Sequence, residues 1–266
     1  MKEMEYLGNI PNVLYKYRDW DKHHHQRLLT HRELFFPSAD MLNDYFEGMI
    51  PFRYKTDQLT ADNIFLKQLE MCEKNHPDWD KEKIHEFSFN IQQQKLLFDE
   101  NHIEETNKFI SKTINDEIGI LSLSSKNNSQ LMWGHYSNSQ KGYCVGFDKH
   151  LLFQEVQGCM GPIQYQDELP LFDLFGKPLE KITTLLFTKP TDWGYEQEYR
   201  ITKWGFSRKT LTFAPNVLKE IVLGARMSDK VKVRIVEIAN INFPHASIFE
   251  LKPSKTMFNF DLHKII

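Results

Sequence analysis

A polar block in the first half of the chain separates two strand-rich regions, and this constrains the fold most. Between about residues 58 and 116, apolar residues recur at the spacing of one helix face, separated by Lys, Glu, Gln and Asn. The pattern predicts three helices, with an interruption near His76-Pro77. We therefore expect a single domain over residues 1–266 that carries a helical insertion at about 58–116.

The regions on either side of the block contain short runs rich in β-branched and aromatic residues, which are typical of strands. The predicted strands are 12–18, 33–37, 118–124, 143–147, 163–165, 193–201, 210–213, 218–224, 248–251 and 258–262. Further helices are predicted within 21–31, after a cap at Asn128 or Ser129, within 171–187, and after Ser228. Because strands and helices are interspersed, we predict an α+β fold with a mixed, mainly antiparallel sheet, flanking helices and an inserted helical segment.

Composition limits the class of protein. The apolar content of 41% and the 20 Phe residues are those of a globular chain, and the formal charge of -3 gives no general basic footprint for nucleic acid. The cysteines, Cys72, Cys144 and Cys159, are odd in number and far apart, which suits a reducing compartment. No signal peptide and no apolar run of ~18 residues is evident. We expect a cytoplasmic protein with no membrane partner; the oligomeric state stays open.

The segment Trp193–Ile201, W-G-Y-E-Q-E-Y-R-I, holds the strongest catalytic candidates. As a strand, it would place Glu196, Glu198 and Arg200 on one face. Two carboxylates that share a pocket repel one another, which raises the pKa of one of them and suits acid–base chemistry. Arg200 either contributes to substrate binding or neutralises the two carboxylates in a structural ion pair.

Two further candidate sets precede this segment. Arg18 ends a predicted strand beside Tyr17, where a guanidinium can hold a phosphate or a carboxylate with two hydrogen bonds. Asn43 and Asp44, with Glu47 nearby, form either a metal or ribose site, or a helix cap or Asx turn.

The block L-M-W-G-H-Y supplies a third set. His135 is a candidate acid or base, Tyr136 a candidate for stacking or hydrogen bonding, and Trp133 a candidate for ligand binding. The alternative for all three is packing in the core. We assign no metal, since consecutive residues such as His23-His24-His25 point about 100° apart on a helix and cannot all face one ion.

The chain resembles the bacterial domain-of-unknown-function 2971 family (DUF2971). The resemblance rests on L-Y-K-Y-R at Leu14–Arg18, L-F-F-P-S-A-D-M-L-N-D-Y-F-E at Leu34–Glu47, the block L-M-W-G-H-Y…K-G-Y-C-V-G-F-D, and W-G-Y-E-Q-E-Y-R-I. Tyr45 stands where this family pattern leads us to expect proline, which affects the expected turn geometry. The family itself implies no reaction.

A second, partial resemblance is to the ADP-ribosyltransferase superfamily. There an early-strand Arg or His, a middle-strand Ser, Thr or Tyr and a late-strand Glu bind and cleave NAD. Arg18 and Glu198 occur in the corresponding order, and Glu196-Gln197-Glu198 is similar to the E-x-E form of the last motif. Ser38 and Tyr136 are both candidates for the middle member. The resemblance implies that Arg18 grips the NAD pyrophosphate, Tyr136 stacks on nicotinamide and Glu198 binds the ribose 2′-hydroxyl.

Two other classes of function compete with an NAD-cleaving enzyme. A nuclease or another phosphodiesterase would use clustered carboxylates to hold Mg²⁺, although E-Q-E-Y-R differs from the E-x-K of a common nuclease core. A non-enzymatic module would bind a protein or a small-molecule nucleotide through aromatic residues, with the carboxylates paired to arginines. Full pairing of Glu198 would favour this module.

Overall fold

The computed structural model describes residues 5, 6 and 9–265. It divides the chain into two compact units. Unit 1 comprises the described residues of Met1–Leu42, Asp116–Asp167 and Phe187–Ile266, and unit 2 comprises Asn43–Asn115 and Glu168–Leu186. The predicted helical insertion falls within unit 2, except for the end of its last helix. The prediction of a single domain stays a prediction.

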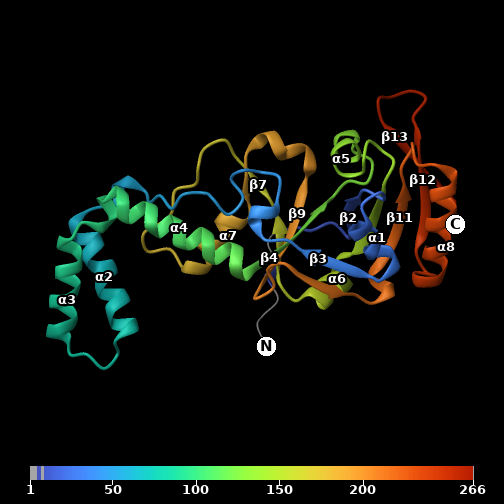
Figure 1. The fold of residues 1–266 in the computed structure, drawn as a ribbon. Coiled ribbons are helices and arrows are strands. Elements are labelled where there is room, and N and C mark those ends of the chain that lie inside the picture. Colours follow the sequence, from blue (N-terminus) through green and yellow to red (C-terminus); the bar gives the residue numbers. More distant parts are fainter. Residues whose placement is uncertain (1–4, 7–8, 266) are drawn as a thin grey trace. The chain divides into compact units, whose positions relative to one another are not determined.

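Unit 1 is built on a large mixed sheet (Figure 1). The order of its strands is β1-β6-β9-β4-β2-β5-β11-β12-β13, in which β1–β6 and β11–β12 are parallel and the other pairs antiparallel. The bounds are β1 Glu5–Tyr6, β2 Val13–Arg18, β4 Ile118–Ser124, β5 Tyr143–Asp148, β6 Cys159–Pro162, β9 Glu198–Trp204, β11 Leu218–Leu223, β12 Ser247–Pro253 and β13 Phe260–Lys264. The predicted α+β class with a mainly antiparallel sheet is confirmed.

Short strands and helices complete unit 1. Strand β3 (Glu33–Phe36) pairs with β10 (Lys209–Thr212), and β7 (Gln164–Tyr165) pairs with β8 (Thr188–Lys189). The helices are α1 His23–Thr30, α5 Gln130–Tyr136, α6 Lys149–Val156 and α8 Asp229–Asn242, with 3-10 turns η1 Ala39–Met41, η4 Thr191–Glu196 and η5 Pro215–Val217. Helix α5 begins at the predicted cap, since the Ser129 hydroxyl accepts the Met132 N–H.

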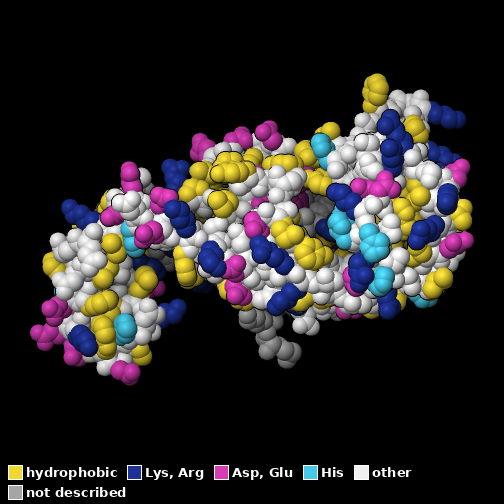
Figure 2. Space-filling model, in the orientation of Figure 1, with side chains coloured by type: hydrophobic (Ala, Val, Ile, Leu, Met, Phe, Trp, Pro, Cys, Tyr) yellow, Lys and Arg dark blue, Asp and Glu magenta, His cyan; other side chains and the backbone are white. Residues whose placement is uncertain are grey.

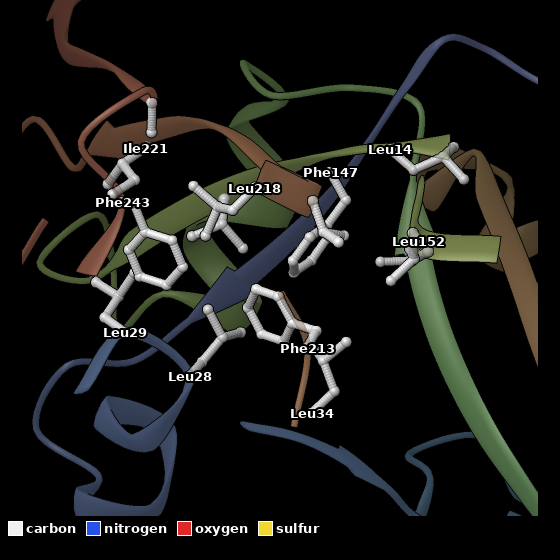
Figure 3. Packing of buried hydrophobic residues seen from close by; sticks show 14 of the residues in the cluster. Leu14, Leu28, Leu29, Leu34, Phe147, Leu152, Phe213, Leu218, Ile221 and Phe243 are labelled. Carbon is white, nitrogen blue, oxygen red and sulfur yellow. The ribbon is translucent and has the colours of Figure 1, made fainter. Parts of the chain in front are cut away.

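The main core of unit 1 lies on the face of the sheet that α1, α6 and α8 cover. Figure 3 shows Leu28 and Leu29 of α1 packed near Phe213 and Phe243, with Phe147 of β5 beside them. A second cluster lies on the opposite face, because Tyr17, Cys144 and Val222 alternate with core residues along their strands. Helix α5 covers this second cluster and positions the candidate site.

Unit 2 is mostly helical. Its helices are α2 Ala61–Asn75, α3 Lys81–Gln93, α4 Glu100–Glu117 and α7 Pro178–Leu186, with 3-10 turns η2 Thr56–Gln58 and η3 Leu96–Phe98. Side chains cap two of them, since Thr60 accepts the Asn63 N–H and Asp80 accepts the Lys83 N–H. Phe52 stacks on Phe172 at a ring-centroid distance of 4.2 Å, which ties the start of the unit to its second segment.

Some elements differ from the sequence prediction. Helix α6 is not among the predicted helices. It begins after Asp148, whose carboxylate accepts the His150 and Leu151 N–H groups and caps the helix. Strand β6 was also missed, because its sequence C-M-G-P contains no alternation. In the described part of the chain, no helix combines the length and the apolar character that a membrane span needs.

Candidate functional site

The predicted strand 193–201 is divided in two. Residues Thr191–Glu196 form η4, and β9 begins at Glu198, so the prediction of one continuous strand is wrong. Gln197 between them has a φ of 42°, which interrupts the strand alternation. Contacts from the end of β4 hold this turn: the Ser124 hydroxyl donates to the Glu196 carbonyl at 2.7 Å, and the Ser125 N–H donates to the Gln197 carbonyl at 3.1 Å.

Glu196, Glu198 and Arg200 nevertheless come together, and Lys189 of β8 joins them. We call these four residues the buried ion cluster. The Lys189 ammonium lies 2.9 Å from Glu196 Oε2 and 2.9 Å from Glu198 Oε2. The Arg200 guanidinium donates from Nε to Glu198 Oε1 at 2.9 Å and from Nη2 to Oε2 at 3.1 Å. All four side chains are buried, and Arg200 is 0% exposed.

The cluster is electrically balanced, with two carboxylates and two cations. Burial by itself would raise the pKa of Glu198, but the charges of Arg200 and Lys189, with hydrogen bonds from Arg200 and Ser122, bring that pKa below its usual range. Glu198 is therefore an anion at neutral pH. It is suited to accept a hydrogen bond or to stabilise a positive charge, rather than to transfer a proton.

A tyrosine links the cluster to the α5 surface. The Tyr136 hydroxyl donates to Glu196 Oε1, so Glu196 is held by Tyr136 on one oxygen and by Lys189 on the other. The rings of the exposed His135 and the half-buried Tyr195 lie 5.7 Å apart, and those of Tyr195 and Trp193 lie 6.2 Å apart. An aromatic surface thus lies next to the cluster.

Trp133 and Tyr17, predicted to bind substrate, lie in the core. Trp133 is 0% exposed, and its Nε1–H donates to the Asn127 carbonyl at 2.7 Å. Tyr17 packs against it edge-to-face at 5.2 Å and donates its hydroxyl to the Lys126 carbonyl. With these polar atoms engaged and both rings buried, the two side chains position α5 on the sheet. Their predicted role in substrate binding stays a prediction.

Arg18 and Glu198 lie on opposite faces of the sheet. Through the register Tyr15–Ser124–Glu198, Glu198 shares a sheet face with Tyr15, whereas Arg18 is in phase with Leu14 and the main core. Burial lowers the pKa of the Arg18 guanidinium to about 10, so it stays positively charged at neutral pH. The predicted role of Arg18 in binding stays a prediction.

Lys16 of β2 interacts electrostatically with both Arg18 and Glu198. Strands β2 and β4 pair through Tyr15 and Ser124, and further along, the buried Lys16 amine donates to the Ser122 carbonyl at 2.7 Å. Burial lowers the Lys16 pKa well below its usual value; Arg18 lowers it further and Glu198 opposes the shift. In Figure 2 the surface is hollowed below α5, where Figure 1 labels β2 and β9.

The structure separates the candidates for the middle position. The Ser38 hydroxyl donates to Asp40 and accepts from Arg208 Nε, so both of these residues engage it. Ser122, which is not among the predicted site residues, lies opposite Arg200 in the β4–β9 register and contributes to lowering the pKa of Glu198. The sequence feature that could have identified Ser122 is the S-L-S at the end of the predicted strand 118–124, which places Ser122 and Ser124 on one face.

Asn43 and Asp44 lie in unit 2. The Asp44 side chain accepts the Phe46 N–H at 3.0 Å, which is the Asx turn weighed as the alternative to a binding role.

Lys189, like Ser122, was not among the predicted site residues. Its sequence signal, a lysine before proline, indicates nothing about its carboxylate partners. In the described part of the chain, no group of three or more His, Cys, Asp or Glu is placed to hold a metal ion.

Comparison with known proteins gives one match. The family model described as "Protein of unknown function (DUF2971)" matches residues 132–201. This match supports the DUF2971 family. Its range contains Tyr136 and the whole buried ion cluster, whereas the two N-terminal segments of the expected resemblance lie outside it. No curated protein and no solved structure matches the chain.

Proposed function

We propose that this DUF2971-like chain is an ADP-ribosyltransferase-like protein that binds NAD beside β4 and β9 and cleaves its glycosidic bond with the help of Glu198. One observation carries the proposal: Ser122 on the middle strand lies on the same face of the sheet as Glu198 on the late strand, opposite Arg200 in the β4–β9 register. The strands β2, β4 and β9, far apart in sequence, are neighbours in the sheet. A middle-strand serine beside a late-strand glutamate is the pairing that the superfamily resemblance implies.

The charge state of Glu198 suits this role. Cleavage of the bond between nicotinamide and ribose leaves positive charge on the ribose as the electron pair departs with nicotinamide. Water then adds to that ribose carbon and releases a proton to the solvent. The Glu198 carboxylate would accept the ribose 2′-hydroxyl proton in a hydrogen bond and stabilise that charge. Arg200 and Lys189 hold the carboxylate in one orientation, so little reorganisation is needed during the reaction. In this proposal, Glu196 orients Tyr136 for stacking on nicotinamide, and the proposal does not depend on Arg18.

The test is release of nicotinamide from NAD by the purified chain, followed by chromatography. Glu198→Gln keeps the shape of the side chain and removes its charge, so we expect the rate to fall by about 10²-fold or more. Glu250→Gln, which removes a carboxylate from β12, is the control and should retain the parent rate. Ser122→Ala leaves all four residues of the ion cluster in place and should lower the rate as well. Cleavage by Glu198→Gln at the parent rate would show the assignment to be wrong.

A second candidate is a non-enzymatic module that binds a nucleotide at the aromatic surface of α5. It is favoured by the engagement of all four carboxylate oxygens of Glu196 and Glu198 with donors from Tyr136, Lys189 and Arg200. NAD binding in calorimetry without nicotinamide release would support this module.

The pairing of all four carboxylate oxygens also counts against a nuclease, since Mg²⁺ would have to displace these donors. A strict Mg²⁺ requirement for nucleic-acid cleavage would restore that alternative.

A further inference from the structure

Strand β13 is an edge strand of the large sheet in the described part of the chain. It pairs with β12 on one side, from Phe249–Lys264 to Pro253–Phe260. The side chains of residues 261–264 are exposed, and Figure 1 shows the strand in red after the loop that leaves β12. The strand lacks proline and a bulge, two of the devices that block an exposed sheet edge, but it is only five residues long and carries the charged Asp261 and Lys264.

The register decides which backbone groups of β13 face outward. The Ile265 N–H donates to the Ile248 carbonyl at 2.8 Å, so it points toward β12. The Phe260 N–H donates to Asn259 Oδ1 at 2.8 Å. Because N–H and C=O groups alternate between the two sides of a strand, the Phe260 C=O and both backbone groups of Leu262 and Lys264 point away from β12. These are the groups that another strand would pair with.

We propose that two copies of this chain form a dimer by antiparallel pairing of their β13 strands, centred on Leu262. A two-fold axis normal to the sheet brings Leu262 opposite Leu262 of the second copy, and Phe260 opposite Lys264. The Leu262 pair exchanges two N–H···O bonds, and in each Phe260–Lys264 pair the Lys264 N–H donates to the Phe260 carbonyl. The two sheets become one continuous sheet.

Side-chain charge selects this register over its neighbours. Centred on Leu262, the pairing places Asp261 opposite His263 of the second copy in the close, non-hydrogen-bonded position, where an acid and a base attract. A shift of the centre to Asp261 would place two carboxylates face to face. A shift of the centre to His263 would place two imidazoles face to face. It would also place Lys264 opposite Leu262 instead of Phe260, so the Lys264 ammonium would lose its cation–π contact with the Phe260 ring.

The test is sedimentation velocity of the full chain over a concentration series from about 1 to about 200 μM, the range in which a small interface dissociates. Leu262→Pro removes an outward N–H at the centre of the pairing, and proline is tolerated at such an edge position. We expect it to weaken dimerisation by about tenfold or more. Ile241→Ser, which removes a 79% exposed apolar side chain from α8, should leave dimerisation unchanged.

A second pair of variants tests the register. Asp261→Lys should weaken the dimer about threefold or more, because it opposes two positive groups, and the exchange Asp261→Lys with His263→Asp should restore it. Circular dichroism checks that each monomer is folded, since Lys252 faces position 261 within the sheet. A parent chain that stays monomeric at every concentration, or a dimer that Leu262→Pro does not weaken, overturns the proposal.

Discussion

The buried ion cluster makes a strong prediction about Lys189. Its ammonium lies 2.9 Å from a carboxylate oxygen of both Glu196 and Glu198, and its side chain is 3% exposed. Lys189→Met keeps most of the side-chain volume but leaves two buried carboxylates with Arg200 as the remaining cation of the cluster. Removing one partner of a buried ion pair costs about 3–5 kcal/mol. We expect a loss of that size in the free energy of unfolding at pH 7.

The loss should depend on pH in a defined direction. In the parent chain the pKa of Glu198 is below its unfolded value, so its stabilising contribution is present above the unfolded pKa and disappears as the pH falls. In Lys189→Met, burial acts on the same carboxylate with one cation fewer, and its pKa rises. Protonation of Glu198 at low pH therefore removes the unpaired buried charge from the variant. The difference in the free energy of unfolding between parent and variant should narrow as the pH falls toward 4.

The assay is urea denaturation followed by tryptophan fluorescence at several pH values, because Trp133 reports on the core beneath α5. Lys252→Met is the matched control: its ammonium lies 3.7 Å from Glu250 and its side chain is 54% exposed, so its removal should cost less than about 0.5 kcal/mol. The reasoning is refuted if Lys189→Met is within about 1 kcal/mol of the parent at pH 7, or if the difference stays constant with pH.

Two further stability predictions use the same denaturation assay. Tyr136→Phe keeps the ring and removes the donor to the buried Glu196, so it should cost about 1–3 kcal/mol, and a cost near zero would mean that this hydrogen bond contributes nothing. Ser129→Ala removes the side chain that caps α5 and should cost about 1 kcal/mol. Ser228→Ala changes a cap position of α8 at which no side-chain hydrogen bond forms, so it should cost less; equal losses would contradict this explanation.

Local patterns in the sequence were sufficient to predict most of the elements. Strand β4 occupies the predicted residues 118–124, and α5 begins after Ser129 as expected, because alternation and capping act between residues close in the chain. The segment 193–201 follows local rules less well. Its break at Gln197 is held by Ser124 and Ser125 of a distant strand, and no pattern within the segment encodes these contacts.

The candidate site shows the same division. The sequence by itself identified Glu196, Glu198 and Arg200 as a charged group, since they alternate within five residues. Only the tertiary structure brought Lys189 and Ser122 to them, buried Trp133, and gave Arg18 the other face of the sheet. The physical reason is that periodicity determines which side chains share a face of one strand, whereas strand order and register determine which faces meet, and these depend on the packing of the whole sheet.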